Sequence, residues 1–178
     1  MDVYASSCPS RGEMDVFIEP VLPRPPLIIF GENELADGLL RLGEFVGLNP
    51  LVFEGNETAV DPSRVISAQD FATYPGLPEG FIVIATQGRG DKAALSAALD
   101  SPCPHIFFIS SRKKAAYWPD ALLRDGITQE RLNCLNAPGG LPLGAQGPNE
   151  IAIAVLAEII QIRRGASPKT TLGDGGTV

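Results

Sequence analysis

Short, uninterrupted apolar runs, each followed by a polar turn, constrain this chain most. The clearest run is Leu27–Phe30, which ends at Gly31, and similar runs follow at Pro50–Glu54, Phe81–Ala85 and His105–Ile109. Strands that are apolar on both faces are typical of a parallel sheet with helices on both sides. The runs therefore predict an α/β fold of the Rossmann type, with a mostly parallel sheet and helices on both faces.

Helical patterns separate these runs. Apolar residues recur every three or four positions from Leu35 to Val46, and Gly47 follows at a helix C-cap position. A second helix is expected over about residues 91–99, and a third after Ser111, with Pro119 restarting it. Thr128 is a suitable N-cap for a short helix that ends near residue 135.

The last helix has the clearest signals. It begins at Pro148 and ends before Gly165, and its apolar residues cover so much of its circumference that we expect it to lie deep against the sheet or in a subunit interface. The least regular region spans residues 55–79, where we expect one brief strand at Arg64–Ile66 and a loop through Tyr74–Gly76.

Length and composition favour one domain. A chain of 178 residues with 44% hydrophobic residues can bury one sizeable core and is short for two. We place the domain at residues 15–165, beginning with a short strand at Asp15–Glu19. Residues 1–14 and 166–178 lack periodicity and are expected to be flexible tails.

Charge and cysteine content exclude several classes of function. The net charge of -7 disfavours binding to nucleic acid. No apolar run reaches the length of about 18 residues that a membrane span needs. Three scattered cysteines and the absence of a signal-like N-terminal segment indicate a cytoplasmic protein.

The turn after the first apolar run departs from the dinucleotide-binding pattern. That pattern, G-x-G-x-x-G, needs a second glycine so that a pyrophosphate can approach the backbone. The frame here begins at Gly31, has Asn33 at the second glycine position and ends at Ala36. We expect the Asn33 side chain to project into the space that a diphosphate normally occupies.

Carboxylates around this turn disfavour a phosphate further. Glu32, Glu34 and Asp37 cluster where the phosphate would lie, and each carboxylate close to a phosphate costs on the order of 1 kcal/mol near a protein surface. Glu54, at the end of the second strand, stands where an acid would accept ribose hydroxyls, but the same position suits a solvated strand end.

Two other turns can accept anions. Ser111, Arg112, Lys113 and Lys114 follow a strand and open a helix, so hydroxyl, amide and three cationic groups converge there, although a solvated basic turn has the same composition. The loop that contains Thr86 and Gly88 follows the strand beside the expected switch point of the sheet.

Catalytic signals are few. His105 is the only histidine, and its place at the start of a strand favours a structural or surface role over that of a base. The cysteines Cys8, Cys103 and Cys134 lack metal-ligand spacing, and Cys8 is interpreted as an incidental thiol in the tail. The chain has neither a nucleophile elbow nor a P-loop. The sequence therefore gives no indication that this domain performs chemistry by itself.

The order of several motifs resembles the C-terminal, Rossmann-like domain of the xanthine dehydrogenase accessory (CoxI-type) proteins. The resemblance covers about residues 16–165. It is carried by Val16–Pro23, Ile29–Gly31, Val83–Thr86 with Gly88, Ser111–Lys114, Ala137–Pro138 with Gly140–Leu141, Gly144–Ala145, Pro148 with Glu150–Ala152, and Leu156–Ile160.

The resemblance implies an accessory, chaperone-like role in the maturation of a molybdenum hydroxylase, with the molybdenum cofactor, a molybdopterin nucleotide, as ligand. The loop that contains Pro138 and Gly140 resembles a family loop and is expected to approach the crevice at the carboxyl edge of the sheet, where the anion-accepting turns lie, although glycine there also suits a simple turn. The family's cysteine-bearing N-terminal domain is missing here, so the implied partners are the apoenzyme, a separate accessory protein that supplies this domain, or a second copy in a homodimer. The alternatives are an NAD(P)-dependent oxidoreductase and a protein-interaction module that binds no nucleotide.

Overall fold

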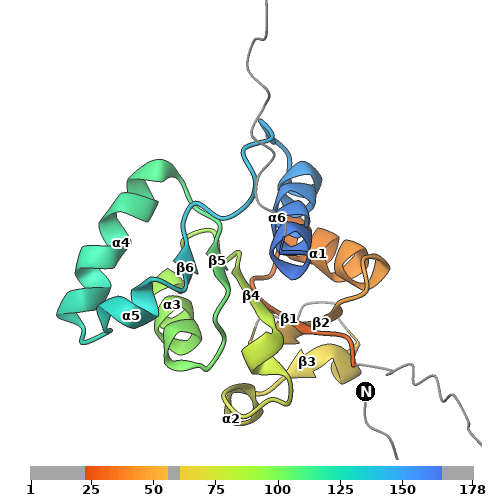
Figure 1. Ribbon diagram of the computed structural model, residues 1–178, viewed down its shortest axis with the longest axis horizontal. Helices are drawn as coiled ribbons and strands as arrows, with labels where there is room; N and C mark the ends of the chain where they lie inside the picture. Colours follow the sequence, from red (N-terminus) through yellow and green to blue (C-terminus); the bar gives the residue numbers. More distant parts are fainter. Residues whose placement is uncertain (1–22, 56–60, 166–178) are drawn as a thin grey trace, which may run out of the picture.

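Six parallel strands form one sheet in the part of the chain that the computed structural model describes, residues 23–55 and 61–165 (Figure 1). Their order is β3-β2-β1-β4-β5-β6, which is that of the Rossmann fold, so the predicted fold class is confirmed. The strands are β1 (Pro26–Phe30), β2 (Asn49–Phe53), β3 (Val65–Ile66), β4 (Phe81–Ile84), β5 (Ile106–Phe108) and β6 (Leu135–Asn136).

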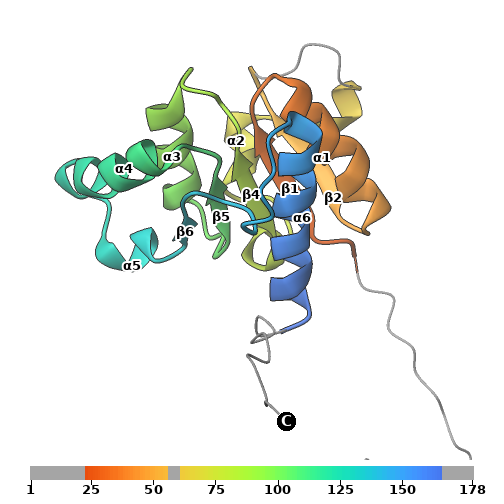
Figure 2. The ribbon, with the colours of Figure 1, turned by 90° about the horizontal axis from the view of Figure 1, so that it is seen from above.

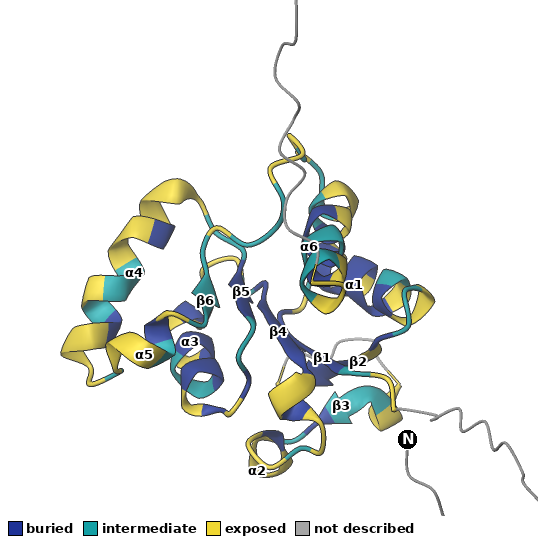
Figure 3. Cartoon of the chain, viewed as in Figure 1, coloured by how far each residue is buried: buried dark blue, intermediate teal, exposed yellow. Residues whose placement is uncertain are grey.

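The two central strands are buried on both faces, as their apolar runs predict. Ile28 of β1 pairs with Leu51 on one side and with Ile82 of β4 on the other. Alternate residues belong to different cores: Ile28 lies in one hydrophobic cluster and its neighbour Ile29 in the other. Figure 3 shows this buried centre between helices whose outer faces are exposed.

Helices cover the two faces unequally. One face carries α1 (Glu34–Phe45) and α6 (Pro148–Arg163), and the opposite face carries the remaining helices (Figures 1 and 2). These are α2 (Ala68–Phe71), α3 (Asp91–Asp100), α4 (Arg112–Arg124) and α5 (Gln129–Leu132). No described helix has both the length and the apolar character that a bilayer crossing requires.

Close packing of α1 on α6 depends on a small residue. A Cβ atom on Gly38 of α1 would lie 3.1 Å from Asn149 Oδ1 and 3.3 Å from the Cβ of Ala152 in α6. Near their C-terminal ends the two helices are joined by Arg163, whose guanidinium donates to the Val46 carbonyl. The two helices therefore run side by side along their length.

The structure corrects three expectations about secondary structure. Pro119 does not restart a helix but lies inside α4, where the burial of Ala115 and Leu122 on either side outweighs the lost backbone hydrogen bond. Residues 55–79 contain α2 and two 3₁₀ turns, Pro62–Arg64 and Leu77–Glu79, besides the expected β3. The sixth strand, β6, was not expected.

The final helix is not buried all round. Its Ala152, Val155 and Ile159 are buried, but Ile153 is 52% exposed and Ile160 39%. The expected strand at residues 15–19 lies outside the described residues.

Candidate functional site

The turn after β1 lies directly against the end of β4. Gly31 has a φ of +150°, and a Cβ atom there would lie 2.6 Å from the Ala85 carbonyl oxygen. Only glycine fits this conformation and this close approach. The strands β1 and β4 are neighbours whose helices lie on opposite faces of the sheet, and ligands of Rossmann folds bind at such a switch point.

Asn33 bridges this switch point. Its Oδ1 accepts a hydrogen bond from the Ala36 amide at 3.1 Å, and its Nδ2 donates to the Ala85 carbonyl at 2.6 Å. The side chain therefore folds back over the start of α1 and does not leave this space open for a diphosphate. It caps α1 and occupies one of the amides that a diphosphate would use.

Carboxylates surround the capped turn. Glu34 and Asp37 are exposed in the first turn of α1, and Glu32 is exposed in the turn itself. Glu54 is exposed just after β2, the strand that pairs with β1. The β1–β2 side of the carboxyl edge is thus acidic and repels a phosphate.

The loop after β4 is organised by a buried carboxylate. Asp91 is only 6% exposed; its Oδ1 accepts from the Thr86 hydroxyl at 2.5 Å and from the Gly88 amide at 2.9 Å. Its Oδ2 accepts from Lys114 Nζ of α4, also at 2.9 Å. Asp91 therefore ties the loop after β4 to the first turn of α4.

These contacts keep Asp91 ionised. Burial raises the pKa of its carboxyl, but hydrogen bonds from Thr86, Lys114 and the Gly88 amide outweigh burial and leave the pKa below its ordinary value. Asp91 and Lys114 lie in the two turns that the sequence predicts to accept anions, but the pairing of their side chains is not predicted. Local sequence gives no signal for their pairing, because they are 23 positions apart and follow different strands.

The turn after β5 gathers cations and hydroxyls. Ser111 caps α4 by accepting from the Lys114 amide at 3.4 Å, and Arg112 and Lys113 are exposed in the first helical turn. Arg89 is exposed on the neighbouring loop. The Ser110 Oγ is enclosed and has no hydrogen-bond partner within the described part of the chain. The β4–β5 side of the edge is therefore basic.

The connection from β6 to α6 crosses this edge. Pro138 follows a cis peptide bond after Ala137 and is exposed. The Gly139 amide donates to the Phe108 carbonyl at the end of β5, and the Gly140 amide donates to Glu158 of α6. Figure 1 shows the connection running from β6 to α6 beyond the ends of the central strands.

The predicted site residues therefore separate into groups. Adjacent strands β1, β4 and β5 bring together Gly31, Asn33, Thr86, Gly88, Ser111, Arg112 and Lys113 at one edge of the sheet. Glu54 lies at the end of β2 on the acidic side, and Pro138 and Gly140 lie in the connection after β6.

Other titratable groups give no catalytic centre. His105 stacks on Phe81 at the amino end of β5, away from the crevice, and burial lowers its pKa. Burial raises the pKa of the Cys103 thiol to about 11, so this thiol is not a nucleophile at neutral pH. Among the described residues, no group of His, Cys, Asp and Glu could hold a metal ion.

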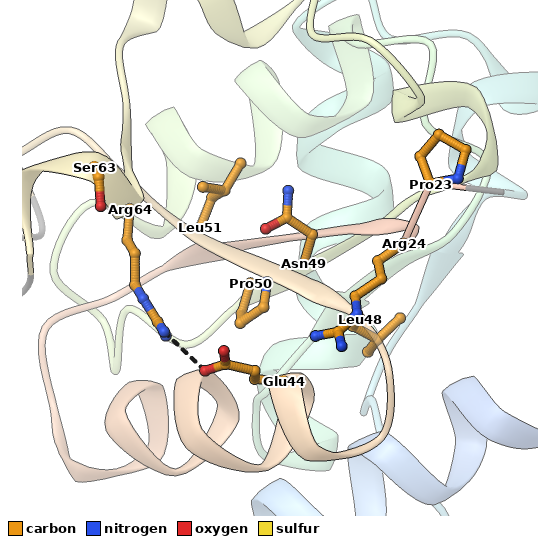
Figure 4. Close-up of a pocket in the computed structure, with 9 residues that line it drawn as sticks. All are labelled: Pro23, Arg24, Glu44, Leu48, Asn49, Pro50, Leu51, Ser63 and Arg64. Atoms are coloured by element: carbon orange, nitrogen blue, oxygen red, sulfur yellow. Dashed lines mark hydrogen bonds and ion pairs between the residues drawn. The ribbon is translucent and has the colours of Figure 1, made fainter. Parts of the chain in front are cut away.

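A polar hollow of about 370 Å³ lies at the opposite edge of the sheet, beside the start of β2 (Figure 4). Arg64 reaches across it to Glu44 at 2.7 Å, and this hydrogen bond lowers the pKa of the Glu44 carboxyl. The ion pair is exposed and therefore weak, and its two charges largely neutralise each other, so we assign no ligand to this hollow.

Comparison with known proteins identifies the family. The profile of the XdhC Rossmann domain matches residues 27–159, which is most of the chain. The chain belongs to this family. The XdhC match includes all the strands of the sheet except the first residue of β1, together with both sides of the crevice.

Related proteins are longer than this XdhC-family chain. It is 30% identical over 175 residues to the uncharacterized protein YqeB of Escherichia coli, covering 93% of this chain and 32% of YqeB. It is 26% identical to a protein of Bacillus subtilis that is named as a probable xanthine dehydrogenase component, covering 84% of this chain and 46% of that one. A crystal structure described as a xanthine dehydrogenase from Bacillus halodurans is 27% identical, with a TM-score of 0.62, and the match covers 84% of this chain and 46% of that one. The chain thus spans less than half the length of each relative.

Proposed function

We propose that this XdhC-family chain is an accessory protein for the maturation of a molybdenum hydroxylase and handles the molybdenum cofactor as cargo. Its kinship with chains named after xanthine dehydrogenase supports the link to such an enzyme. The observation that carries the proposal is the division of charge at the carboxyl edge. An anionic cofactor is repelled from the β1–β2 side and attracted to the β4–β5 side.

The β4–β5 side fits the phosphate of a molybdopterin nucleotide. Arg112 and Lys113 lie at the N-terminus of α4, where first-turn amides have no partner within the helix. Lys114 is fixed by Asp91 and remains 45% exposed, so it can contact an anion as well. The enclosed Ser110 hydroxyl gives a further polar group at the same strand end. Of these groups, the exposed cations and the first-turn amides of α4 would hold the phosphate.

A nicotinamide oxidoreductase is the less favoured function. The Asn33 cap and the acids around it oppose a diphosphate at α1, and no described side chain near the crevice is a convincing proton donor. We therefore assign the chain a binding role without catalysis. The proposed partners are the apoenzyme and a separate accessory protein.

Equilibrium titration tests the proposal. We would titrate the chain with NAD, NADP, FAD and a molybdopterin nucleotide by calorimetry, using the fluorescence of Trp118, one helical turn after Lys114, as a second signal. Selective binding of the molybdopterin nucleotide is expected. Micromolar binding of NAD with no pterin binding would instead support the oxidoreductase, and binding of none of the ligands would support an interaction module.

A pair of variants on α4 locates the phosphate. Replacing Arg112 with Ala removes a cation from the N-terminal turn and should weaken pterin nucleotide binding roughly 10- to 150-fold, since a hydrogen bond to a charged group contributes roughly 1.5 to 3 kcal/mol. Arg124→Ala removes the same charge from the opposite end of the helix and should leave the affinity unchanged. Equal effects of the two variants would remove this turn from the site.

A further inference from the structure

The outer face of α6 carries a narrow stripe that nothing in the described chain covers. Ile153 and Ile160 are 52% and 39% exposed, and Ala157 between them is half-buried. Glu150 extends the stripe toward the N-terminus and Arg164 toward the C-terminus, and both are exposed. Large apolar side chains exposed in a row on one helix face indicate an interaction surface.

The spacing of this stripe is that of a coiled-coil seam. The intervals from Glu150 to Ile153, Ala157, Ile160 and Arg164 are three, four, three and four residues, the repeat that keeps one face toward a partner helix. The opposite face of α6 packs on α1 and the sheet, so the seam belongs to a second contact. The small Ala157 at its centre allows close approach of another helix.

The two ends of the seam are complementary to each other. If a second α6 packs antiparallel about a two-fold axis at Ala157, Ile153 lies against Ile160 of the other copy and Glu150 lies beside its Arg164. In a parallel pairing the like charges would meet at both ends. The charge pattern therefore favours one partner, a second copy of the same helix in the antiparallel orientation.

We propose that the chain forms a two-fold symmetric dimer through this face of α6. The hydrogen bond from Arg163 to the Val46 carbonyl places the end of α1 next to the end of α6. Phe45, the residue before Val46, is 88% exposed and therefore adds apolar surface beside the seam. The acidic turn and the basic turn of the crevice involve other residues, so the dimer does not depend on the proposed ligand. A single pair of α6 helices buries less surface than the about 800 Å² per partner of a standard interface, so we expect a dissociation constant in the micromolar range.

Sedimentation equilibrium with matched variants tests the interface. The full chain should sediment as a dimer at high micromolar concentration, and Ile153→Lys should weaken the dimer at least about 100-fold, because each dimer loses two buried isoleucines. Leu123→Lys, at a 41% exposed leucine on α4, is the control and should leave the dimer intact. Circular dichroism would verify that both variants fold. A monomeric wild-type chain, or a dimer that Ile153→Lys does not weaken, would overturn the proposal.

Cysteine crosslinking tests the position of the two-fold axis separately. In a chain with Cys8 and Cys134 replaced by serine, Ala157→Cys lies on the proposed axis and should form an intermolecular disulfide on mild oxidation. Ala116→Cys, on the exposed face of α4, should not. Failure of Ala157→Cys to crosslink, or equal crosslinking of both variants, would overturn an axis at Ala157. A mixture of Ile153→Cys and Ile160→Cys chains, distinguished by mass, tests the orientation: crosslinks between the two different chains are expected, and crosslinks only between like chains would overturn the antiparallel arrangement.

Discussion

Replacing Asn33 with alanine should destabilise the fold through two separate contacts. The first is the N-cap, in which Oδ1 accepts from the Ala36 amide, and its loss typically costs about 1 kcal/mol. The second is the hydrogen bond from Nδ2 to the Ala85 carbonyl, whose loss should cost about 1 kcal/mol. The free energy of unfolding should therefore fall by about 2 kcal/mol.

Urea unfolding followed by circular dichroism would measure this loss, with two comparison variants that separate the contacts. Ser111→Ala removes an N-cap alone, so it should cost about half as much. Asn33→Asp keeps the cap but places a carboxylate oxygen against the Ala85 carbonyl, so it should destabilise although aspartate is an equally good cap. If Asn33→Ala costs no more than Ser111→Ala and Asn33→Asp is neutral, the bridge across the switch point does not form.

Two further predictions concern the charged side chains of Asp91 and Arg131. Asp91→Asn should lower the free energy of unfolding by about 1 to 3 kcal/mol at pH 7. Because the pKa of the Asp91 carboxyl is lower in the folded state, this contribution is present above pH about 4 and disappears as the pH falls through the folded pKa. The stabilities of wild type and variant, measured by urea unfolding, should therefore converge in acid, and a constant difference between them would contradict the assignment. Arg131→Ala should lower the free energy of unfolding by about 2 to 4 kcal/mol, because the guanidinium donates to the carbonyls of Leu99, Ser101 and Cys103. Arg131→Lys should recover only part of this stability. If Arg131→Ala costs less than about 1 kcal/mol, water replaces the guanidinium at these carbonyls.

The strands were predictable because burial on both faces leaves an uninterrupted apolar run. Leu27–Phe30 and Phe81–Ala85 have this pattern, and both correspond to strands in the structure. The strand β6 could not be found in the same way, because it has only two residues and one of them is Asn136. Its place in the sheet comes from pairing with β5, which local sequence does not encode.

For the candidate site, the sequence predicts which strand ends carry the residues but not the directions or contacts of their side chains. The sequence placed Asn33 at the position of a missing glycine, but the direction of its side chain depends on Ala85, 52 residues later. The broad apolar content of α6 likewise predicted burial, yet the structure leaves one stripe of the helix exposed because the sheet and α1 together cover only part of it. Contacts of long sequence separation decided both outcomes.

The capped turn and the fixed cation belong to one chain of hydrogen bonds across the crevice. Asn33 holds the Ala85 carbonyl, the next residue, Thr86, donates to Asp91, and Asp91 in turn positions Lys114 on α4. The contact that blocks a diphosphate at α1 therefore also anchors the loop that places a cation at α4. A second glycine at the position of Asn33 would remove this anchor while leaving the surrounding acids in place. Under the proposed function, the altered turn would direct an anion to the β4–β5 side of the edge, and its hydrogen bonds give it a structural role that a merely decayed dinucleotide site would not need.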